Sequence, residues 1–390
     1  MVAVLSTTGR AVVVALVATA RSVVAQQIPP SIEFRVPKPP TVAVSDSGAL
    51  LSYELHVTNL TSIPMRLRRV EVLDADKPSV VVSSLSDSAL LRAVARPAPV
   101  IPAAKRTEIG AGLRAYVYLW IPVNRATAPT RLRHRLTFQR IAFDTTAAGR
   151  DTSIVVLEGT TIPVEREAVV IAPPIRGEWA AFNGPANSSG HRRLVLALDG
   201  HVAIGQRFAI DYLQVDSTGS SRRGDALKNS SYYAYGTELL AVADGIVAVT
   251  KDSIPENVPG ATSRAVTINL ETVGGNHVGI DIGGGRYALY AHVQPHSLRV
   301  KVGDRVKRGQ VIALLGNSGN STEPHVHFQI ADGPTFLSSE GLPYALESFD
   351  VVGRCGIDNG PPPAIKCSRG APITVKGGMP LQNELVRFPK

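Results

Sequence analysis

The sequence predicts a mainly β protein with two folded units, and three observations support this. The chain has 390 residues, which is longer than one ordinary domain, and 44% of them are hydrophobic, which is enough for two buried cores. Short runs that alternate apolar and polar residues recur between turn residues, as strands of antiparallel sheets do. No stretch has the apolar spacing of a long amphipathic helix.

Residues 1–25 have the pattern of a secretory signal peptide. Arg10 precedes an apolar run at 11–20, and small residues at 23–25 fit cleavage before Gln26. The run is too short to span a bilayer and no later stretch is long enough, so we expect no integral membrane span after signal removal. An uncleaved N-terminal anchor is the alternative. The expected location is therefore secreted or periplasmic.

The net charge of +9 and the two cysteines limit the partners and the chemistry. No dense Lys/Arg run with interleaved aromatic residues occurs, so we expect no nucleic-acid partner. A basic exported protein is attracted to anionic polymers, although a solvated basic surface explains most of these charges more simply. In an oxidising compartment Cys355 and Cys367 would form a disulfide, and two free thiols are the alternative.

Residues 28–165 are predicted to form an immunoglobulin-like β-sandwich that serves as an accessory domain. Alternating runs occur at 50–59, 65–73, 115–122 and 131–138. The region has no cluster of acidic residues, no histidine pair and no glycine loop, and single histidines in its strands are expected to be ordinary strand residues. Residues 166–190 follow as a predicted linker, because proline, glycine, asparagine and serine interrupt any regular element there.

The second unit, residues 191–350, is again predicted to consist mostly of strands. A hairpin is expected from 192 to 207 around the turn Asp199-Gly200. Further strands are predicted at 208–213, 238–249, 265–270, 277–281, 286–292 and 311–315. The glycine clusters between these strands lack the following Lys-Ser/Thr of a phosphate-binding loop. Residues 351–390 form a tail with little periodicity, which either wraps back on this unit or stays flexible.

The pair His325 and His327 is the strongest local signal of chemistry. The two residues follow a glycine-rich loop on an extended run, where residues i and i+2 share one face of a strand. Two imidazoles held by a rigid sheet suit a divalent metal and its surroundings. Two surface histidines at a sheet edge are the alternative, since a His-x-His pair by itself is a weak signal.

Residues 205–331 contain, in this order, the pieces Ile210-Asp211, Leu289-Tyr-Ala-His292, Gly316-Asn-Ser-Gly319 and Pro324-His-Val-His-Phe328. This order of motifs resembles the lysostaphin-type (LytM-like) zinc endopeptidases that cut peptidoglycan. It implies an antiparallel-sheet metallopeptidase domain, a Zn²⁺ cofactor and peptidoglycan or another peptide as substrate. It also implies Asp211 and His327 as zinc ligands, and His292 and His325 as histidines that orient the water and stabilise the transition state.

One position departs from this family pattern. The family places a zinc-binding histidine four residues before the aspartate, and here that residue is Arg207, which has no lone pair to offer a metal. In the predicted hairpin position 191 faces position 208, so His191 is the candidate third ligand. His201 lies at the hairpin tip, too far along the strand to replace it.

Two other functions remain open from the sequence. The first is a degenerate module of the same fold that binds peptidoglycan or activates another hydrolase without cutting, which Arg207 would favour. The second is a biotinyl- or lipoyl-type carrier, because the turns near Asp244 and Lys307 resemble those of carrier sheets.

Overall fold

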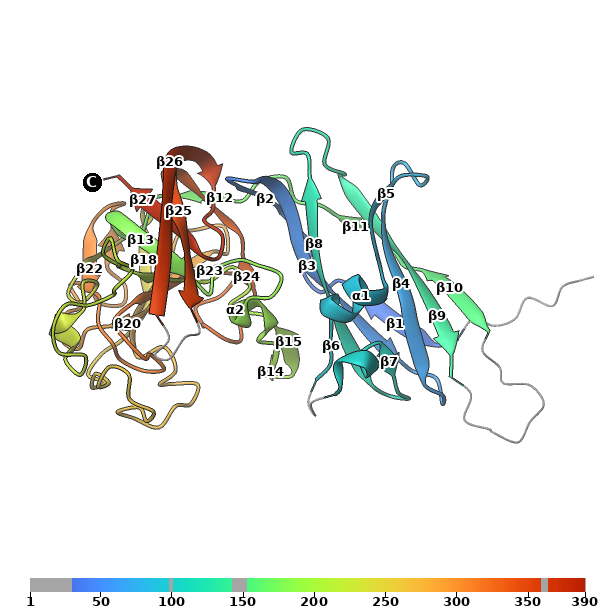
Figure 1. Ribbon diagram of the computed structural model, residues 1–390, viewed down its shortest axis with the longest axis horizontal. Coiled ribbons are helices and arrows are strands. Elements are labelled where there is room, and N and C mark those ends of the chain that lie inside the picture. Colours follow the sequence, from blue (N-terminus) through green and yellow to red (C-terminus); the bar gives the residue numbers. More distant parts are fainter. Residues whose placement is uncertain (1–29, 98–100, 142–152, 359–363, 390) are drawn as a thin grey trace, which may run out of the picture.

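The computed structural model describes residues 30–97, 101–141, 153–358 and 364–389, and it is mainly β as predicted (Figure 1). The proposed signal peptide, residues 1–25, lies outside the described residues. The described helices are short: α1 (Asp87–Ala93), α2 (Gly190–Arg193), and the 3₁₀ turns η1 (Ala103–Lys105) and η2 (Asn229–Ser231). None of the described helices has the length and hydrophobicity needed to cross a membrane.

The N-terminal unit consists of two sheets. The first has the order β1-β3-β8-β6, with β2 paired to β3: β1 (Ile32–Arg35), β2 (Val42–Ser45), β3 (Gly48–Asn59), β6 (Val94–Ala95) and β8 (Arg114–Val123). The second has the order β10-β9-β4-β5, with β7 paired to β4 and β11 to β9: β4 (Met65–Asp74), β5 (Val81–Ser86), β7 (Glu108–Ile109), β9 (Arg131–Arg140), β10 (Ile154–Glu158) and β11 (Ile162–Pro163). The four strands predicted in this region are confirmed as β3, β4, β8 and β9.

A single core lies between these two sheets. Leu51 and Val117 from the first sheet are fully buried in the same cluster as Val70 and Leu136 from the second. Apolar side chains on one face of each strand exclude water by packing face to face, which is the arrangement of a sandwich. The sandwich is thus present, and its immunoglobulin-like topology remains a prediction.

The C-terminal unit is built on one large sheet. Its path is β12-β25-β27-β13-β16-β23-β20-β19-β18-β21, with β24 paired to β23 and β26 to β25, and every pair is antiparallel except β12–β25. The strands are β12 (Val169–Ile171), β13 (Gly177–Phe182), β16 (Ile210–Leu213), β18 (Gly245–Lys251), β19 (Asn276–Asp281), β20 (Tyr287–Val293), β21 (Arg305–Val306), β23 (Val326–Ala331), β24 (Gly341–Leu342), β25 (Tyr344–Asp358), β26 (Ala364–Gly378) and β27 (Glu384–Phe388). Two small sheets accompany it: β14 (Leu196–Leu198) with β15 (His201–Ala203), and β17 (Glu238–Leu240) with β22 (Val311–Leu314).

The central strands of this sheet place the candidate site residues. All residues of β16 and β23 are buried, and the register pairs Asp211 with His327, while Ala291 of β20 also lies opposite His327. Cross-strand partners lie close enough for their side chains to meet. The sheet therefore brings Asp211 beside His327 without any contribution from a loop.

The predicted linker at 166–190 was wrong about local structure. It contains β12, β13 and the start of α2, and β13 pairs with both β16 and β27 in the middle of the sheet. The prolines and glycines stand at the ends of these short strands rather than inside them. Trp179 of β13 is fully buried in the main core, and residues 179–182 are all buried, so both faces of this part of the strand are covered and no alternation marks it.

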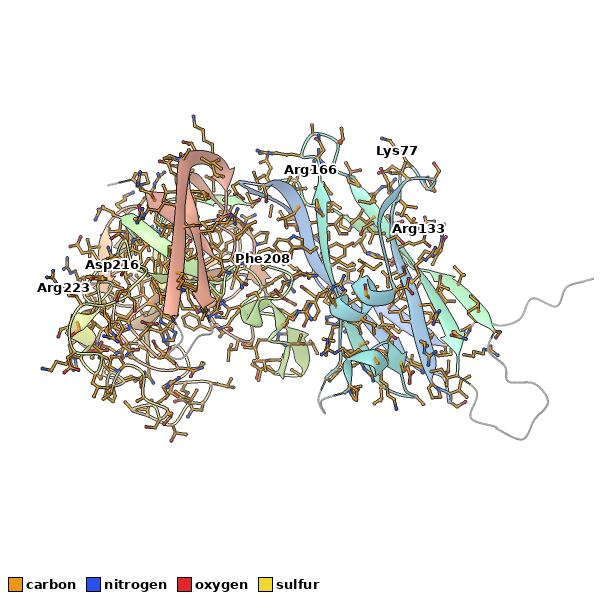
Figure 2. All side chains as sticks on the ribbon, viewed as in Figure 1. Lys77, Arg133, Arg166, Phe208, Asp216 and Arg223 are labelled. Carbon is orange, nitrogen blue, oxygen red and sulfur yellow. A yellow bond between two sulfur atoms is a disulfide. The ribbon has the colours of Figure 1, made fainter. Side chains whose placement is uncertain are left out.

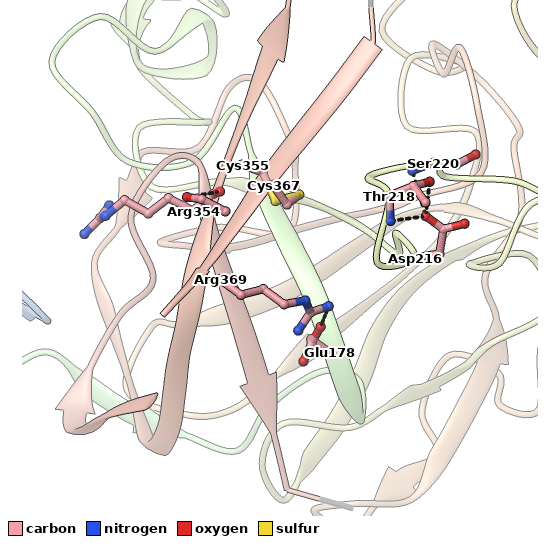
Figure 3. Close-up of a disulfide and its surroundings, with 9 residues drawn as sticks. Glu178, Asp216, Thr218, Ser220, Arg354, Cys355, Cys367 and Arg369 are labelled. Atoms are coloured by element: carbon pink, nitrogen blue, oxygen red, sulfur yellow. Dashed lines mark hydrogen bonds and ion pairs between the residues drawn. A yellow bond between two sulfur atoms is a disulfide. The ribbon is translucent and has the colours of Figure 1, made fainter. Parts of the chain in front are cut away.

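The tail at 351–390 also belongs to the sheet, and a boundary at 350 would fall inside β25. The long hairpin β25–β26 carries the predicted disulfide between the directly paired Cys355 and Cys367, and β27 returns to lie against β13 (Figures 1 and 3). Most of β26 is exposed, so no buried face produces a period-two pattern in the sequence. The backbone ladder and the disulfide hold a hairpin that hydrophobic periodicity does not reveal.

Three predicted elements differ from the structure for local reasons. The predicted strand 238–249 is interrupted at residues 241–244, which divides it into β17 in a small sheet and β18 in the large one. Residues 265–270 alternate in exposure but pair with no described strand, so they form bends and turns. The predicted hairpin keeps its tip, with Leu198 paired to His201, but each arm is only three residues long. Positions 190–193 form α2 instead of a strand, so the predicted pairing of 191 with 208 was wrong.

The two units share a continuous interface. Phe208 lies where they meet (Figure 2), and Ala43 and Leu50 from the sandwich belong to the main core of the C-terminal unit. The backbone amide of Met379 also donates to the carbonyl of Val44 in β2 at 2.8 Å. The sandwich is therefore packed against the sheet that carries the site.

Candidate metal centre

Three side chains from three elements converge at the centre of the large sheet. His191 of α2, Asp211 of β16 and His327 of β23 offer ligand atoms that all lie within 4.8 Å of one another. His327 Nδ1 is 2.9 Å from Asp211 Oδ1, and His191 Nε2 is 3.5 Å from Asp211 Oδ2. Two imidazoles and one carboxylate are a donor set typical of zinc.

Gln329 fixes the orientation and tautomer of His327. The Gln329 Nε2 amide donates to the carbonyls of Gly205 and Phe336, so its Oε1 is the atom that faces His327 Nε2 at 2.9 Å. An amide oxygen can only accept, so His327 Nε2 carries the proton. When the His327 ring is neutral, its Nδ1 atom therefore has a lone pair that faces Asp211 Oδ1. Two acceptor atoms only 2.9 Å apart repel each other unless they share a proton or bind a cation. The residues present therefore fit a zinc ion.

His191 reaches this cluster from a segment that is organised around Asn183. The Asn183 Nδ2 amide donates to Asp211 Oδ2 at 2.8 Å, and Ser189 Oγ donates to the Asn183 carbonyl just before α2 begins. Asn183 has a φ of 48°, a left-handed conformation that asparagine tolerates better than most residues. Asn183 was not predicted as a site residue from the sequence, because the turn Asn183-Gly-Pro185 was interpreted as part of a linker.

His292 and His325 stand beside the three ligand candidates with their reactive nitrogens defined. His292 Nδ1 donates to the Ser318 carbonyl and His325 Nδ1 to the Glu323 carbonyl, both at 2.8 Å. Each ring therefore keeps a lone pair on Nε2 when it is neutral. The His325 Nε2 atom is 3.6 Å from Asp211 Oδ1, and the ring centroids of His292 and His325 are 4.7 Å apart.

Glycines allow the backbone contacts that hold His292. Gly275 has a φ of 61°, and a Cβ there would come within 2.5 Å of the Ser318 carbonyl oxygen. A Cβ on Gly319 would lie 2.2 Å from the Gly275 nitrogen. The two turns therefore interlock only without side chains, and this close approach presents the Ser318 carbonyl to His292.

Burial and mutual charge shift the pKa values in opposite directions within the cluster. Burial alone would raise the pKa of the Asp211 carboxyl, but the charges of His191 and His325 and the hydrogen bond from His327 hold it well below its usual range. For His292, burial together with the neighbouring His325 and His327 rings keeps the pKa well below that of a free histidine. Burial also lowers the pKa of His191, although Asp211 opposes this effect. His327 moves the other way: burial alone would lower its pKa, but the hydrogen bond to Asp211 and the charge of that carboxylate raise it above that of a free histidine. The cluster thus favours an ionised carboxylate that shares a proton with His327, beside neutral His191 and His292 rings, and a bound metal would replace that proton.

A cavity of about 310 Å³ opens beside the cluster. Its walls include all five site candidates, and Arg264, Asn320, Thr322 and Phe336 complete much of the rest. Arg264 donates from Nη1 to the Ala261 carbonyl, while its buried Nε has no hydrogen-bond partner. Among the described residues no carboxylate forms an ion pair with Arg264, so its positive charge is available to the cavity.

Arg207 belongs to a different cluster from Asp211. Its guanidinium forms ion pairs with Glu54 and Glu340, both at 2.8 Å, and donates to the Gly341 carbonyl. The residue that departs from the family pattern is therefore bound to carboxylates of its own. His201, judged too distant, bonds to the Ser338 carbonyl outside the metal cluster. Lys307, the carrier candidate, forms an exposed ion pair with Asp244.

Part of the second unit matches the model of a known protein family. Residues 231–337 match the model of peptidase family M23. The second unit contains an M23 domain. The match includes His292, His325 and His327, whereas His191 and Asp211 precede it.

Two curated relatives and one solved structure illustrate how far the similarity to other M23 proteins extends. A stretch of 57 residues is 47% identical to glycyl-glycine endopeptidase ALE-1 of Staphylococcus capitis, covering 14% of this chain and 15% of that protein. A stretch of 95 residues is 34% identical to peptidoglycan DD-endopeptidase ShyA of Vibrio cholerae, covering 24% and 17%. The catalytic domain of the prophage-encoded M23 protein EnpA from Enterococcus faecalis is 25% identical with a TM-score of 0.26, covering 44% of this chain and 93% of that one. The chain thus matches less than a fifth of the length of either curated relative.

Proposed function

We propose that this protein is a zinc-dependent endopeptidase that hydrolyses peptide bonds of peptidoglycan outside the cytoplasm. The observation that carries the proposal is the convergence of His191, Asp211 and His327, with His292 and His325 beside them in one cavity. The M23 match and the peptidoglycan endopeptidases among the relatives support the reaction class and the substrate. The apolar run at 11–20 supports export.

In this proposal His191 Nε2, an Asp211 oxygen and His327 Nδ1 hold the zinc ion. When bound, zinc lowers the pKa of a coordinated water towards neutrality and polarises the scissile carbonyl. Gln329 keeps the proton of His327 on Nε2, so that Nδ1 remains a ligand atom. Asn183 holds the Asp211 carboxylate by its second oxygen, which limits rotation of the ligand.

His325 and His292 carry the proton in this proposal. Their Nδ1 protons are engaged by backbone carbonyls, so proton exchange takes place at Nε2. The lowered pKa of His292 keeps the ring neutral, and it can therefore accept a proton from the attacking water. Once protonated, either ring can donate to the developing oxyanion or to the leaving amine.

Arg264 is the proposed anchor for a substrate carboxylate. It lines the same cavity as the histidines, and its buried Nε has no hydrogen-bond partner among the described residues. A guanidinium recognises a carboxylate by two parallel hydrogen bonds. Peptides that carry a free carboxylate near the cut bond are therefore the expected substrates.

The rival function, a degenerate module that binds without cutting, rests on Arg207 at the usual ligand position. That arginine is bound to Glu54 and Glu340, and His191 offers an imidazole in its place. The feature that favoured the rival is therefore compatible with a complete set of ligands.

The test measures zinc content and cleavage on the protein from Gln26 onwards. We expect about one zinc per chain and release of peptides from purified peptidoglycan. His191→Ala should bind zinc much more weakly and lose cleavage. His201→Ala, which changes an exposed histidine outside the cluster, serves as the matched control and should keep both. Absence of zinc from the wild-type protein after zinc addition would favour the non-catalytic binder.

A further inference from the structure

The short helix α2 connects two buried clusters that lie on its opposite sides. His191 points to Asp211 and His327 in the metal centre. The next residue, Arg192, points the other way and forms an ion pair with Glu54 of β3 at 3.0 Å. Glu54 belongs to the N-terminal sandwich, 138 residues earlier in the chain. One peptide unit therefore separates a proposed zinc ligand from a contact with the other unit.

Arg192 donates three hydrogen bonds to the sandwich. The side chain is fully buried, and Nη2 donates to the carbonyls of Tyr53 and Leu119 at 3.0 and 2.8 Å. Nε donates to Glu54, and Nη1 donates to Asn187 Oδ1 at 2.7 Å. A guanidinium with this many bonds to β3 and β8 cannot shift without breaking several of them.

Aromatic residues of β8 complete the contact. The Arg192 guanidinium lies 5.5 Å from the ring centroids of Tyr118 and Trp120, and that of Arg193 lies 4.6 Å from Tyr118. Cations over aromatic faces are attracted to them, and more so when water is excluded. Both arginines of α2 therefore pack against aromatic rings of the sandwich.

The helix itself supplies little rigidity. α2 has four residues, and its N-cap Ser189 makes no capping hydrogen bond from its side chain to the helix. A helix of one turn is unstable in isolation because nucleation costs more than one turn of hydrogen bonds returns. The position of His191 is therefore set by the contacts of the residues next to it, and the most deeply buried of these is Arg192.

The charges of this second cluster balance. Glu54 binds Arg192 and Arg207, and Arg207 also binds Glu340 at 2.8 Å. Two arginines face two carboxylates, so the set is neutral although it is buried. Removing one member would leave an unpaired buried charge, which is strongly destabilising.

We propose that the N-terminal sandwich is a structural part of the metal centre. Glu54 acts as a positioning residue that, through Arg192, holds the His191 imidazole where it can bind zinc. The inference rests on the zinc site of the proposed function. It assigns the sandwich a role in completing the site, so separation of the two units would release one metal ligand.

The experiment compares zinc affinity in full-length mature protein with that of a charge-balanced variant. Glu54→Gln combined with Arg192→Met removes the connection to α2 but leaves the Arg207–Glu340 pair intact. We expect the zinc dissociation constant, measured by chelator competition, to rise by about 10- to 100-fold, the range seen when groups that orient ligands are lost. The visible spectrum of the Co²⁺-substituted protein should change in the same way as in His191→Ala.

A mutant cycle separates positioning from general damage. If Glu54 acts through His191, adding the double change to His191→Ala weakens zinc binding no further. Lys38→Met removes another ion pair between the units, Lys38–Asp332, and should leave zinc affinity unchanged. Arg192→Lys keeps the charge opposite Glu54 and should show a smaller loss in a protein whose folding is preserved.

The outcomes distinguish the inference from the proposed function. Wild-type zinc affinity and an unchanged Co²⁺ spectrum in the double variant, or in Arg192→Lys if the double variant does not fold, would overturn the inference. Additive losses in the triple variant would overturn it as well. Absence of zinc binding in both the wild type and Lys38→Met would instead refute the metal centre on which it rests.

Discussion

The two buried clusters on either side of α2 each surround one carboxylate, but with different nitrogen-bearing side chains. Each is centred on one buried carboxylate, Asp211 in the metal centre and Glu54 at the interface. Burial would raise the pKa of both carboxyl groups, yet cationic or polar neighbours lower it in each case. The neighbours are imidazoles around Asp211 and guanidinium groups around Glu54.

The type of nitrogen decides what each cluster can do. Arginine stays charged and has no lone pair, so the Glu54 cluster is a closed set of ion pairs that stabilises the interface. Imidazole can be neutral and offers a lone pair, so the Asp211 cluster can accept a metal and move a proton. Arg207, at the position where the family pattern has a histidine, belongs to the Glu54 cluster. His191 belongs to the Asp211 cluster.

Arg207→His should cause the largest loss of stability among the variants considered. It restores the imidazole of the family pattern but leaves Glu54 and Glu340 without their shared guanidinium. We expect the free energy of unfolding to fall by about 3–5 kcal/mol, the cost of removing one partner of a buried ion pair, and zinc affinity to stay the same or weaken. Urea unfolding and chelator competition measure the two effects. Unchanged stability with tighter zinc binding would contradict the assignment of Arg207 to the interface.

Glu384 is a third buried carboxylate, and unlike Asp211 and Glu54 it lies close to another carboxylate, Asp46. Burial raises its pKa to about 8, and the nearby Asp46 adds to this, although Arg354 opposes it. The folded protein then keeps a proton that the unfolded chain releases above about pH 4.5, so this group makes stability fall as the pH rises from about 4.5 to about 8.

We expect Glu384→Gln to remove most of this loss, on the order of 3 kcal/mol. Urea unfolding at pH 5 and pH 8 measures it as the difference between the wild type and the variant. Glu347→Gln, which changes an exposed carboxylate paired with Arg308, is the control. An equal decline in stability in wild type and Glu384→Gln would show that the proton is not held at this site.

Gln329→Met tests whether the His327 tautomer matters for zinc binding. It keeps the side-chain volume but loses the acceptor that fixes the proton of His327 on Nε2. We expect zinc affinity to fall about 10- to 100-fold, with little change in the cleavage rate at saturating zinc. Gln310→Met, on an exposed turn, should have no effect. The prediction fails if Gln329→Met binds zinc as tightly as the wild type.

Arg264→Met should have the smallest effect, and one limited to substrate binding. For peptides with a free carboxylate near the cut bond we expect KM to rise at least about tenfold, the low end of the cost of losing hydrogen bonds to a charged group, while kcat stays the same. Amidated peptides should be cut equally well by both proteins. Equal loss on both substrates would mean that Arg264 does not bind the carboxylate.

Many of the strands, and the placement of His325 and His327 on one strand, follow from local sequence patterns. Period-two runs predicted β3, β4, β8 and β9, and the His-x-His spacing predicted one face of β23. The same patterns failed for β13 and β25–β26. The first has both faces buried and the second has much of its length exposed, so neither alternates. His191 was selected through a hairpin register that the structure does not have, although the structure does place it beside Asp211.

The residue types and their spacing set the chemistry available to this protein: the strands, the paired histidines, the aspartate and an arginine instead of a histidine at 207. Which nitrogen pairs with which carboxylate depends on how the two units pack in three dimensions. Arg192 and Arg207 turn to Glu54 because a buried carboxylate of the sandwich needs cations around it, and His191 is thereby directed to Asp211. That choice depends on a contact across 138 residues, which no local periodicity can encode.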